Sequence, residues 1–212
     1  MADPLDDVGA GLTRREWLRH AGIAGAVAAV APVVALSAQG DALENLSTAE
    51  AAILDALVAR LIPSDESGPG AREARAARYI DRALGGALAS SREVYRAGLS
   101  AMDVYAQRSK GGPFASLRES DQDAVLSDME RNVATGFAPN GAAFFNLLRT
   151  HTWQGTFGDP YYGGNAGFVG WDLIGYPGVR LNVTAADQRM GVPIKPIRRS
   201  AYDYAMFAAG AH

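Results

Sequence analysis

The stretch that decides the fold is residues 47–63, which read STAEAAILDALVARLIP. Ser47 and Glu50 match a capping box, in which a hydroxyl at the helix start and an acidic residue three positions later bind free backbone N–H groups. Proline cannot continue a helix, so Pro63 ends this one. The apolar residues between these signals recur at the spacing of one helical face, at Ile53, Leu54, Leu57, Val58, Leu61 and Ile62. We therefore predict an amphipathic helix with one buried side.

Four more helices are predicted further along the chain, and no run of residues alternates as a strand would. We expect them at 71–84, from 90 or 91 to the break at 111–113, at 120–133 and from about 140 onward. The apolar positions that carry the helical spacing are Ala74, Ala77, Ile80, Ala83, Leu84, Val94, Tyr95, Leu99, Met102, Tyr105, Val125, Leu126, Met129, Phe144, Phe145, Leu147 and Leu148. The expected fold class is all-α, a small bundle of about five helices.

The composition excludes several kinds of site. Cysteine is absent, which excludes disulfides, a thiolate nucleophile, an iron–sulfur cluster and covalently attached haem in this chain. Three histidines, His20, His151 and His212, are too few for a histidine-rich metal centre. The net charge of -3 gives no indication of nucleic-acid binding. With 212 residues, 48% of them hydrophobic, the chain is long enough to form one core.

Residues 1–40 have the order of an export signal: a polar start, a basic segment, a mildly apolar run from 21 to 36, and small residues. Arg14 and Arg15, followed by Trp17 and Leu18, resemble a twin-arginine signal. This predicts export to the periplasm through the twin-arginine translocase, with possible membrane association. The alternative is an uncleaved leader that tethers a structural protein to a membrane; sequencing of the mature N-terminus would separate the two.

The segment from Trp153 to Gly178 differs from the helices because glycine recurs every few residues among tryptophans and tyrosines. Glycine allows close backbone approach and disfavours a long helix, while the aromatic rings offer large rigid contact areas. A phosphate-binding loop is not favoured, because no strand precedes the glycines and the Gly-Lys-Ser/Thr ending is missing. Two interpretations remain: the segment covers its own bundle, or it forms a surface that a partner protein binds.

Several motifs within residues 46–180 resemble the gluconate 2-dehydrogenase subunit 3 family. They are Arg60-Leu61-Ile62-Pro63-x-Asp65, Asp159-Pro-x-Tyr162-Gly163-Gly164-Asn165, Gly170-Trp171 and Gly175-Tyr176-Pro177-Gly178. The resemblance implies a non-catalytic small subunit that stabilises a flavoprotein dehydrogenase large subunit and escorts it through export. The large subunit would be of the glucose-methanol-choline type, carry FAD and oxidise a sugar, sugar acid, glucoside or other alcohol.

The same resemblance places no cofactor in this chain and allows a cytochrome c, with haem c, as a further subunit. The interpretation of the glycine-aromatic segment as a partner surface indicates which residues would meet the large subunit. The predicted partner interface comprises Trp153, Asp159, Tyr161, Tyr162, Gly163, Gly164, Asn165, Gly170, Trp171, Tyr176, Pro177 and Gly178.

The alternative is an independent hydrolase with His151 as base, supported by Asp159 or a nearby serine. No Gly-x-Ser-x-Gly nucleophile motif is present, and His151 lies on the apolar side of its helix. A buried histidine with a hydrogen-bond partner is therefore the favoured interpretation. In domain terms we expect a signal segment at 1–40 and a single domain at 41–212, with helices at 46–157, the glycine-aromatic loop at 158–180 and an extended C-terminal arm at 181–212.

Overall fold

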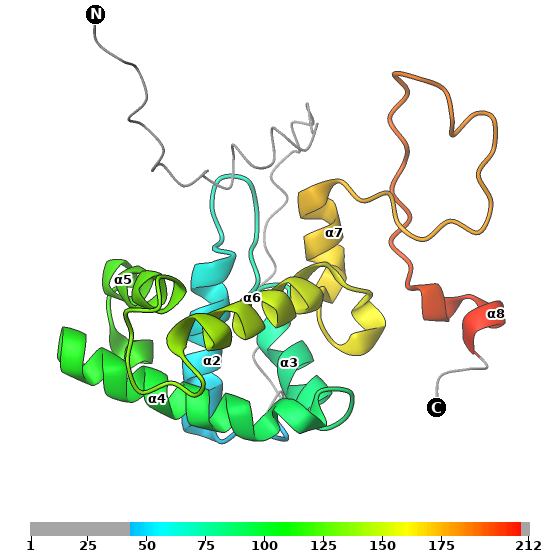
Figure 1. Ribbon diagram of the computed structural model, residues 1–212. Coiled ribbons are helices and arrows are strands. Elements are labelled where there is room, and N and C mark those ends of the chain that lie inside the picture. Colours follow the sequence, from blue (N-terminus) through cyan, green and yellow to red (C-terminus); the bar gives the residue numbers. More distant parts are fainter. Residues whose placement is uncertain (1–42, 209–212) are drawn as a thin grey trace, which may run out of the picture. The chain divides into compact units, whose positions relative to one another are not determined.

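The computed structural model describes residues 43–208, so the predicted export residues Arg14, Arg15, Trp17 and Leu18 lie outside the described part. Within it the fold is all-α, as predicted, and the described residues form no strand. The five predicted helices are α2 (Thr48–Leu61), α3 (Ala76–Leu84), α4 (Arg92–Lys110), α5 (Glu119–Glu130) and α6 (Gly141–Phe157). Figure 1 shows these helices crossing one another at several angles rather than lying in one parallel bundle. None of the described helices is both long and apolar enough to cross a membrane.

Short helices follow α6, three of them in the glycine-aromatic segment and two near the end of the arm. They are η3 (Pro160–Tyr162), η4 (Ala166–Phe168), α7 (Val169–Ile174), η5 (Ala201–Asp203) and α8 (Ala205–Ala208). Two further single turns, η1 (Ala89–Ser91) and η2 (Phe114–Ser116), flank α4. In Figure 1 the chain leaves α7, makes a wide loop without helices, and returns toward η5 and α8.

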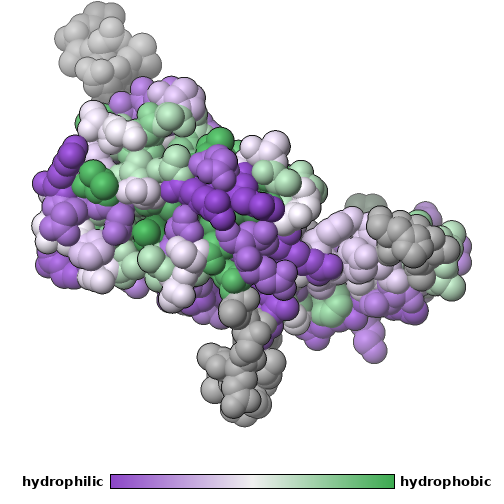
Figure 2. Space-filling view, turned by 90° about the horizontal axis from the view of Figure 1, so that it is seen from below, coloured by the Kyte–Doolittle hydropathy of each residue, from purple (hydrophilic) through white to green (hydrophobic). Residues whose placement is uncertain are grey.

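The core is formed by the apolar faces that the sequence spacing predicts. Leu54, Leu57 and Val58 of α2 are fully buried, and α4 and α6 contribute Tyr95 and Phe144 among others. At Gly98 a Cβ atom would lie 2.3 Å from the Phe144 ring, so α4 and α6 pack this closely only because residue 98 has no side chain. Val94, expected among the helical apolar positions, is exposed. The face in Figure 2 is largely hydrophilic, with single apolar residues between the polar ones.

The prediction for the second helix was wrong at its start. The helix was expected from residue 71, but it begins at Ala76. Arg75, the residue before it, adopts a left-handed backbone with φ 57°, which interrupts helical geometry. The preceding turn is held by other bonds: the Ala71 N–H donates to the Ile62 carbonyl, and the Glu73 carboxylate accepts the Gly70 N–H. Burial raises the pKa of Glu73, but hydrogen bonds to its carboxylate, chiefly from the Ser64 hydroxyl and also from the Gly70 N–H, lower it overall.

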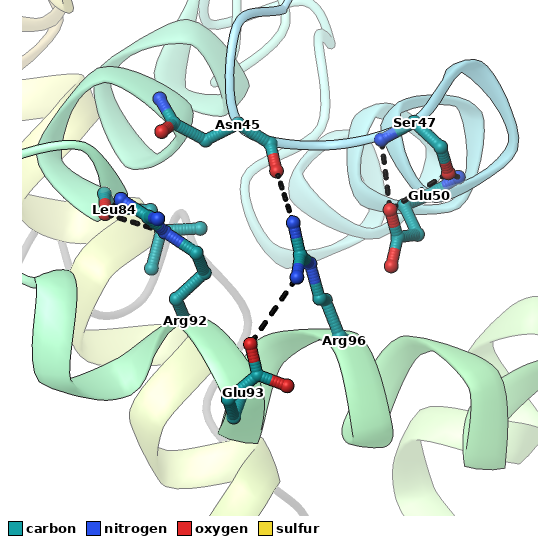
Figure 3. Close-up of polar contacts among 7 residues, drawn as sticks. All are labelled: Asn45, Ser47, Glu50, Leu84, Arg92, Glu93 and Arg96. Carbon is teal, nitrogen blue, oxygen red and sulfur yellow. Dashed lines mark hydrogen bonds and ion pairs between the residues drawn. The ribbon is translucent and has the colours of Figure 1, made fainter.

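The segment that leads into α2 is fixed by one buried carboxylate. Asp81 of α3 is 3% exposed and accepts three backbone N–H groups, from Glu44, Asn45 and Leu46, at 2.7–3.0 Å. Figure 3 shows a further contact of this segment: the Arg96 guanidinium of α4 donates to the Asn45 carbonyl and pairs with Glu93. The capping box of Ser47 and Glu50 follows directly. The described chain is therefore tied to α3 from its first residues.

We predict that Asp81→Ala lowers the free energy of unfolding by about 2–4 kcal/mol, because three N–H groups, one buried and two part-buried, lose a charged acceptor. The matched control is Glu93→Ala, which removes an exposed carboxylate and should change stability by less than about 1 kcal/mol. Urea denaturation followed by circular dichroism measures both. Equal stabilities of the two variants would contradict the anchoring role of Asp81.

Candidate partner interface

The glycine-aromatic segment is attached to the end of α6 through the buried amide side chain of Asn165. This side chain is 0% exposed; its Nδ2 donates to the Gly158 carbonyl and its Oδ1 accepts the Gly170 N–H, both at 2.8 Å. The Asn165 backbone N–H donates to the Gly155 carbonyl at 2.7 Å. Asn165 adopts a left-handed conformation, with φ 43°, which asparagine tolerates better than most residues. One residue thus joins the last turns of α6 to the first turn of α7.

Two glycines let the backbone of the segment lie directly against α6. A Cβ atom at Gly164 would lie 2.1 Å from the Gly155 carbonyl oxygen, and one at Gly170 would lie 1.8 Å from that of Thr156. Real Cβ atoms do not approach oxygens this closely, so only glycine fits at either position. The glycine spacing in the sequence therefore reflects contact between two backbones.

Trp171 covers this contact and is itself buried. Its exposure is 5%, and its indole N–H donates to the Phe157 carbonyl at 2.9 Å. The rings of Phe168 and Tyr176 flank it, with centroids 5.2 and 4.9 Å away. Tryptophan can be buried here because its polar N–H finds an acceptor at a helix end, where carbonyls lack helical partners.

Asp159 connects the segment to the C-terminal arm. Its carboxylate accepts the Tyr161 N–H within its own turn, the Ser200 hydroxyl at 2.6 Å and the Ala201 N–H at 2.9 Å. Further along, the Arg198 guanidinium pairs with Asp172 at 2.7 Å, a contact that raises the pKa of Arg198. The arm is thus held against the glycine-aromatic segment by two acidic side chains at positions 159 and 172.

Three tyrosines gather where the arm returns. Tyr161 and Tyr202 stack with ring centroids 4.0 Å apart, and Tyr162 stands edge-on to both. The hydroxyls of Tyr162 and Tyr202 share a short hydrogen bond, which is the main reason that the pKa of Tyr162 is raised to about 12. Tyr161 and Tyr162 are nevertheless exposed, so this cluster presents aromatic area to the outside.

A second exposed aromatic group lies on α6. Trp153 is 51% exposed, and the Arg149 guanidinium lies 5.5 Å from the centre of its ring. Trp153 begins the glycine-rich stretch of the sequence, and in the structure α6 continues through it to Phe157. Its helical position directs a large aromatic surface outward beside the buried His151 and Thr152.

The structure divides the predicted interface residues into three groups: buried, exposed and half-buried. Gly164, Asn165, Gly170, Trp171 and Gly178 are buried within this chain. Exposed aromatic surface comes from Trp153, Tyr161, Tyr162 and Tyr176, while Asp159, Gly163 and Pro177 are half-buried. The buried group fits the interpretation that the segment covers its own bundle, and the exposed group leaves a surface for a partner.

Sequence reasoning missed the arm residues that complete this region. Ser200 is buried, and Tyr202 stacks in the tyrosine cluster. A signal was present, because Ser200 and Asp203 form a capping box like the one at the start of α2. The arm was expected to be extended and irregular throughout, whereas this box starts the short helical turns η5 and α8.

His151 is buried with a partner, as the sequence favoured. Its Nδ1 lies 2.8 Å from the Tyr95 hydroxyl, and the two rings stack. Burial lowers the pKa of His151 and raises that of Tyr95 far above its usual value. The Asp159 carboxylate is engaged by Ser200, Tyr161 and Ala201 instead. The geometry therefore does not bring together the residues that the hydrolase alternative would use.

Elsewhere in the described part of the chain, several basic side chains form ion pairs with acidic ones. The largest group is Arg60 of α2 with Glu119 and Asp123 of α5, whose hydrogen bonds and charges raise the pKa of Arg60. It borders a hollow of about 450 Å³ between α2, the turn at residues 62–64 and α5. Between residues 43 and 208 no group of three or more acidic or histidine side chains is placed to hold a metal ion.

Comparison with protein families gives a match to the gluconate 2-dehydrogenase subunit 3 model over residues 48–178. The chain belongs to the gluconate 2-dehydrogenase subunit 3 family. The match runs from the first helix of the bundle to the end of the Gly175-Tyr176-Pro177-Gly178 motif. Membership indicates an accessory subunit of a multi-subunit dehydrogenase complex. Comparisons with curated proteins and with solved structures gave no match.

We predict that Asn165→Ala in this subunit 3 chain lowers the free energy of unfolding by about 2–4 kcal/mol. The substitution leaves a buried N–H and a buried carbonyl without partners. Asn146→Ala, on the exposed side of α6, is the matched control and should change stability by less than about 1 kcal/mol. Chemical denaturation measures the difference; an Asn165 variant as stable as the control would show that the amide does not hold the segment.

A second prediction concerns pH. The pKa of His151 is lower in the folded than in the unfolded protein, so the unfolded state binds more protons as the pH falls below about 6.5. The contribution of His151 to stability is present above that pH and is lost as the pH falls toward its folded-state pKa, by up to about 1.4 kcal/mol per pH unit. Unfolding free energies of wild type and His151→Gln between pH 8 and 5 test this. The wild type should lose more stability than the variant; parallel curves would contradict the prediction.

Proposed function

We propose that this chain is the non-catalytic small subunit of a periplasmic dehydrogenase complex. Its large subunit is a flavoprotein of the glucose-methanol-choline type that carries FAD and oxidises a sugar, sugar acid, glucoside or other alcohol. The family match over residues 48–178 is the observation that carries this proposal. A cytochrome c that accepts the electrons is a possible third subunit.

The contribution of this chain is to stabilise the flavoprotein. Exposed Trp153, Tyr161, Tyr162 and Tyr176 supply the kind of aromatic anchors that protein interfaces favour. They lie on or beside the segment that Asn165 fastens to α6, so a partner meets rings that are already held in place. Such preorganisation reduces the entropy lost on binding.

The second part of the proposed role is export. The twin-arginine pattern at Arg14 and Arg15 supports a leader that carries the folded flavoprotein out together with this chain. The absence of cysteine is compatible with folding before export, because no disulfide has to form outside the cytoplasm.

Affinity purification of the tagged full-length chain tests the proposal. We expect it to retain a flavoprotein, identified by mass spectrometry and by the absorbance of FAD, and the complex to reduce an artificial acceptor when given its alcohol substrate. The chain expressed alone should carry no flavin and show no turnover. Turnover by the isolated chain, or purification without any flavoprotein, would refute the proposed function.

We predict that Trp153→Ala weakens the complex with that flavoprotein about tenfold or more, because a large exposed ring anchors the contact. Arg108→Ala, an exposed change near the end of α4, is the control and should have little effect. Titration by biolayer interferometry measures both dissociation constants. Unchanged affinity of the Trp153 variant, with its fold intact, would exclude this part of α6 from the interface.

For export, we predict that Arg14→Lys combined with Arg15→Lys leaves both subunits in the cytoplasm, because the paired arginines are the recognition signal. Arg118→Lys with Arg131→Lys, the same chemical change at two exposed positions, is the control. Immunoblotting of periplasmic and cytoplasmic fractions follows both proteins. Export of the flavoprotein with the Arg14 and Arg15 variant would refute the escort role.

A further inference from the structure

We propose that the loop of residues 181–196 is the part of this chain that lies across the dehydrogenase large subunit and selects it. The inference rests on the proposed function, since it names the surface through which the two subunits bind. It concerns a loop outside residues 48–178, over which the family model matches.

The loop is held firmly at its base. The Ile197 N–H donates to the Pro177 carbonyl at 3.0 Å, and the Arg180 guanidinium donates to the Lys195 carbonyl. At Gly178, with φ +85°, a Cβ atom would lie 1.9 Å from the Ile197 carbonyl oxygen, so the two ends of the loop touch backbone to backbone. The loop therefore leaves the domain and returns to it at one fixed point.

Beyond this base the loop has almost no contact with its own chain. Every residue from 181 to 196 is exposed except Asp187, which Thr184 and Arg180 bind. Figure 1 shows the loop (orange) standing away from the helices. Ordering a segment of this length costs conformational entropy that buried surface must offset, and here the chain itself buries very little.

Among the residues that the loop exposes are five large apolar ones, several of them two positions apart. Leu181 and Val183 lie on its outgoing part, and Met190, Val192 and Ile194 lie on its returning part, at alternate positions. Met190 is 100% exposed. Extended backbone presents residues two apart on the same side, which applies to Val192 and Ile194. Met190 lies in the turn before them, where Gly191 has φ +76° and the Val192 N–H donates to the Arg189 carbonyl. Exposed apolar surface of this kind marks a binding site on soluble proteins.

The favoured occupant is the large subunit, for two reasons. The base of the loop at Pro177 and Gly178 directly follows the exposed Tyr176, so the loop adjoins the exposed part of the predicted interface. A lipid surface suits the loop poorly, because irregular backbone leaves polar groups that hydrocarbon cannot satisfy.

The test compares two triple variants of the full-length chain. Met190→Ser, Val192→Ser and Ile194→Ser remove apolar side chains from the loop. Val94→Ser, Val104→Ser and Val133→Ser remove exposed apolar side chains from the helical domain, where the exposed fractions are 41–57%. The probe is the flavoprotein that copurifies with the wild-type chain, expressed separately. We expect the dissociation constant to rise about tenfold or more for the loop variant and less than about twofold for the control.

Hydrogen exchange gives a second readout that does not depend on substitutions. Amides of residues 181–196 should exchange rapidly in the free chain and at least about tenfold more slowly in the complex. Equal affinities of the two variants, or a loop that stays unprotected in the complex, would overturn the inference while leaving the proposed function intact. Two other results for the loop variant, each with unchanged flavoprotein affinity, would also overturn the inference. Loss of self-association would assign the loop to a second copy of this chain, and loss of binding to anionic vesicles would assign it to lipid. If the wild-type chain binds no flavoprotein, both the proposed function and this inference are refuted.

Discussion

The structure depends on one close contact, in which the backbone of residues 164–170 lies against the last turns of α6. Helix ends leave carbonyl groups without helical partners, and here Gly155, Gly158 and Phe157 offer theirs to Asn165 and Trp171. The contact needs glycine at 164 and 170 for space and an amide at 165 for its donor and acceptor. The tyrosine cluster and the arm adjoin this contact, and the arm is attached beside it through Asp159 and Asp172.

This constraint changes how the most distinctive sequence motif should be interpreted. Glycines, Asn165 and Trp171 carried the family resemblance, and a partner surface was the natural explanation for so many aromatic and glycine residues. The structure buries these residues in their own domain and leaves other aromatic rings exposed. The motif therefore specifies internal packing that attaches the segment to α6. The exposed aromatic rings and the loop of residues 181–196 lie next to this packed region and face outward. A partner can be bound by residues that the motif positions but does not include.

The sequence predicted the helices well because their signals are local. A capping box, helical spacing and a terminating proline or glycine lie within a few residues of one another, as at Ser47 and Pro63 or at Asn140. The start of α3 was missed because Arg75 is held in a left-handed conformation by a turn whose bonds reach back to Ile62 and Gly70. The position of the arm was also missed because it depends on a long-range contact. Asp159 and Ser200 are 41 residues apart, and no local sequence pattern indicates that they bind. Burial of Asn165 and exposure of Trp153 are equally long-range outcomes.

A subunit that supports another protein faces two opposing demands. Under the proposed function, its surface must be ordered beforehand, because disorder in both partners costs affinity, yet it must also discriminate its partner from other proteins. The chain meets the first demand with the packed contact at Asn165, whose polar groups are satisfied internally and need nothing from a partner. A loop anchored at both ends and otherwise exposed meets the second, because its side chains can change without disturbing the packing beneath. In the proposed arrangement, the packed contact before residue 178 maintains the fold and the exposed loop after it binds the partner.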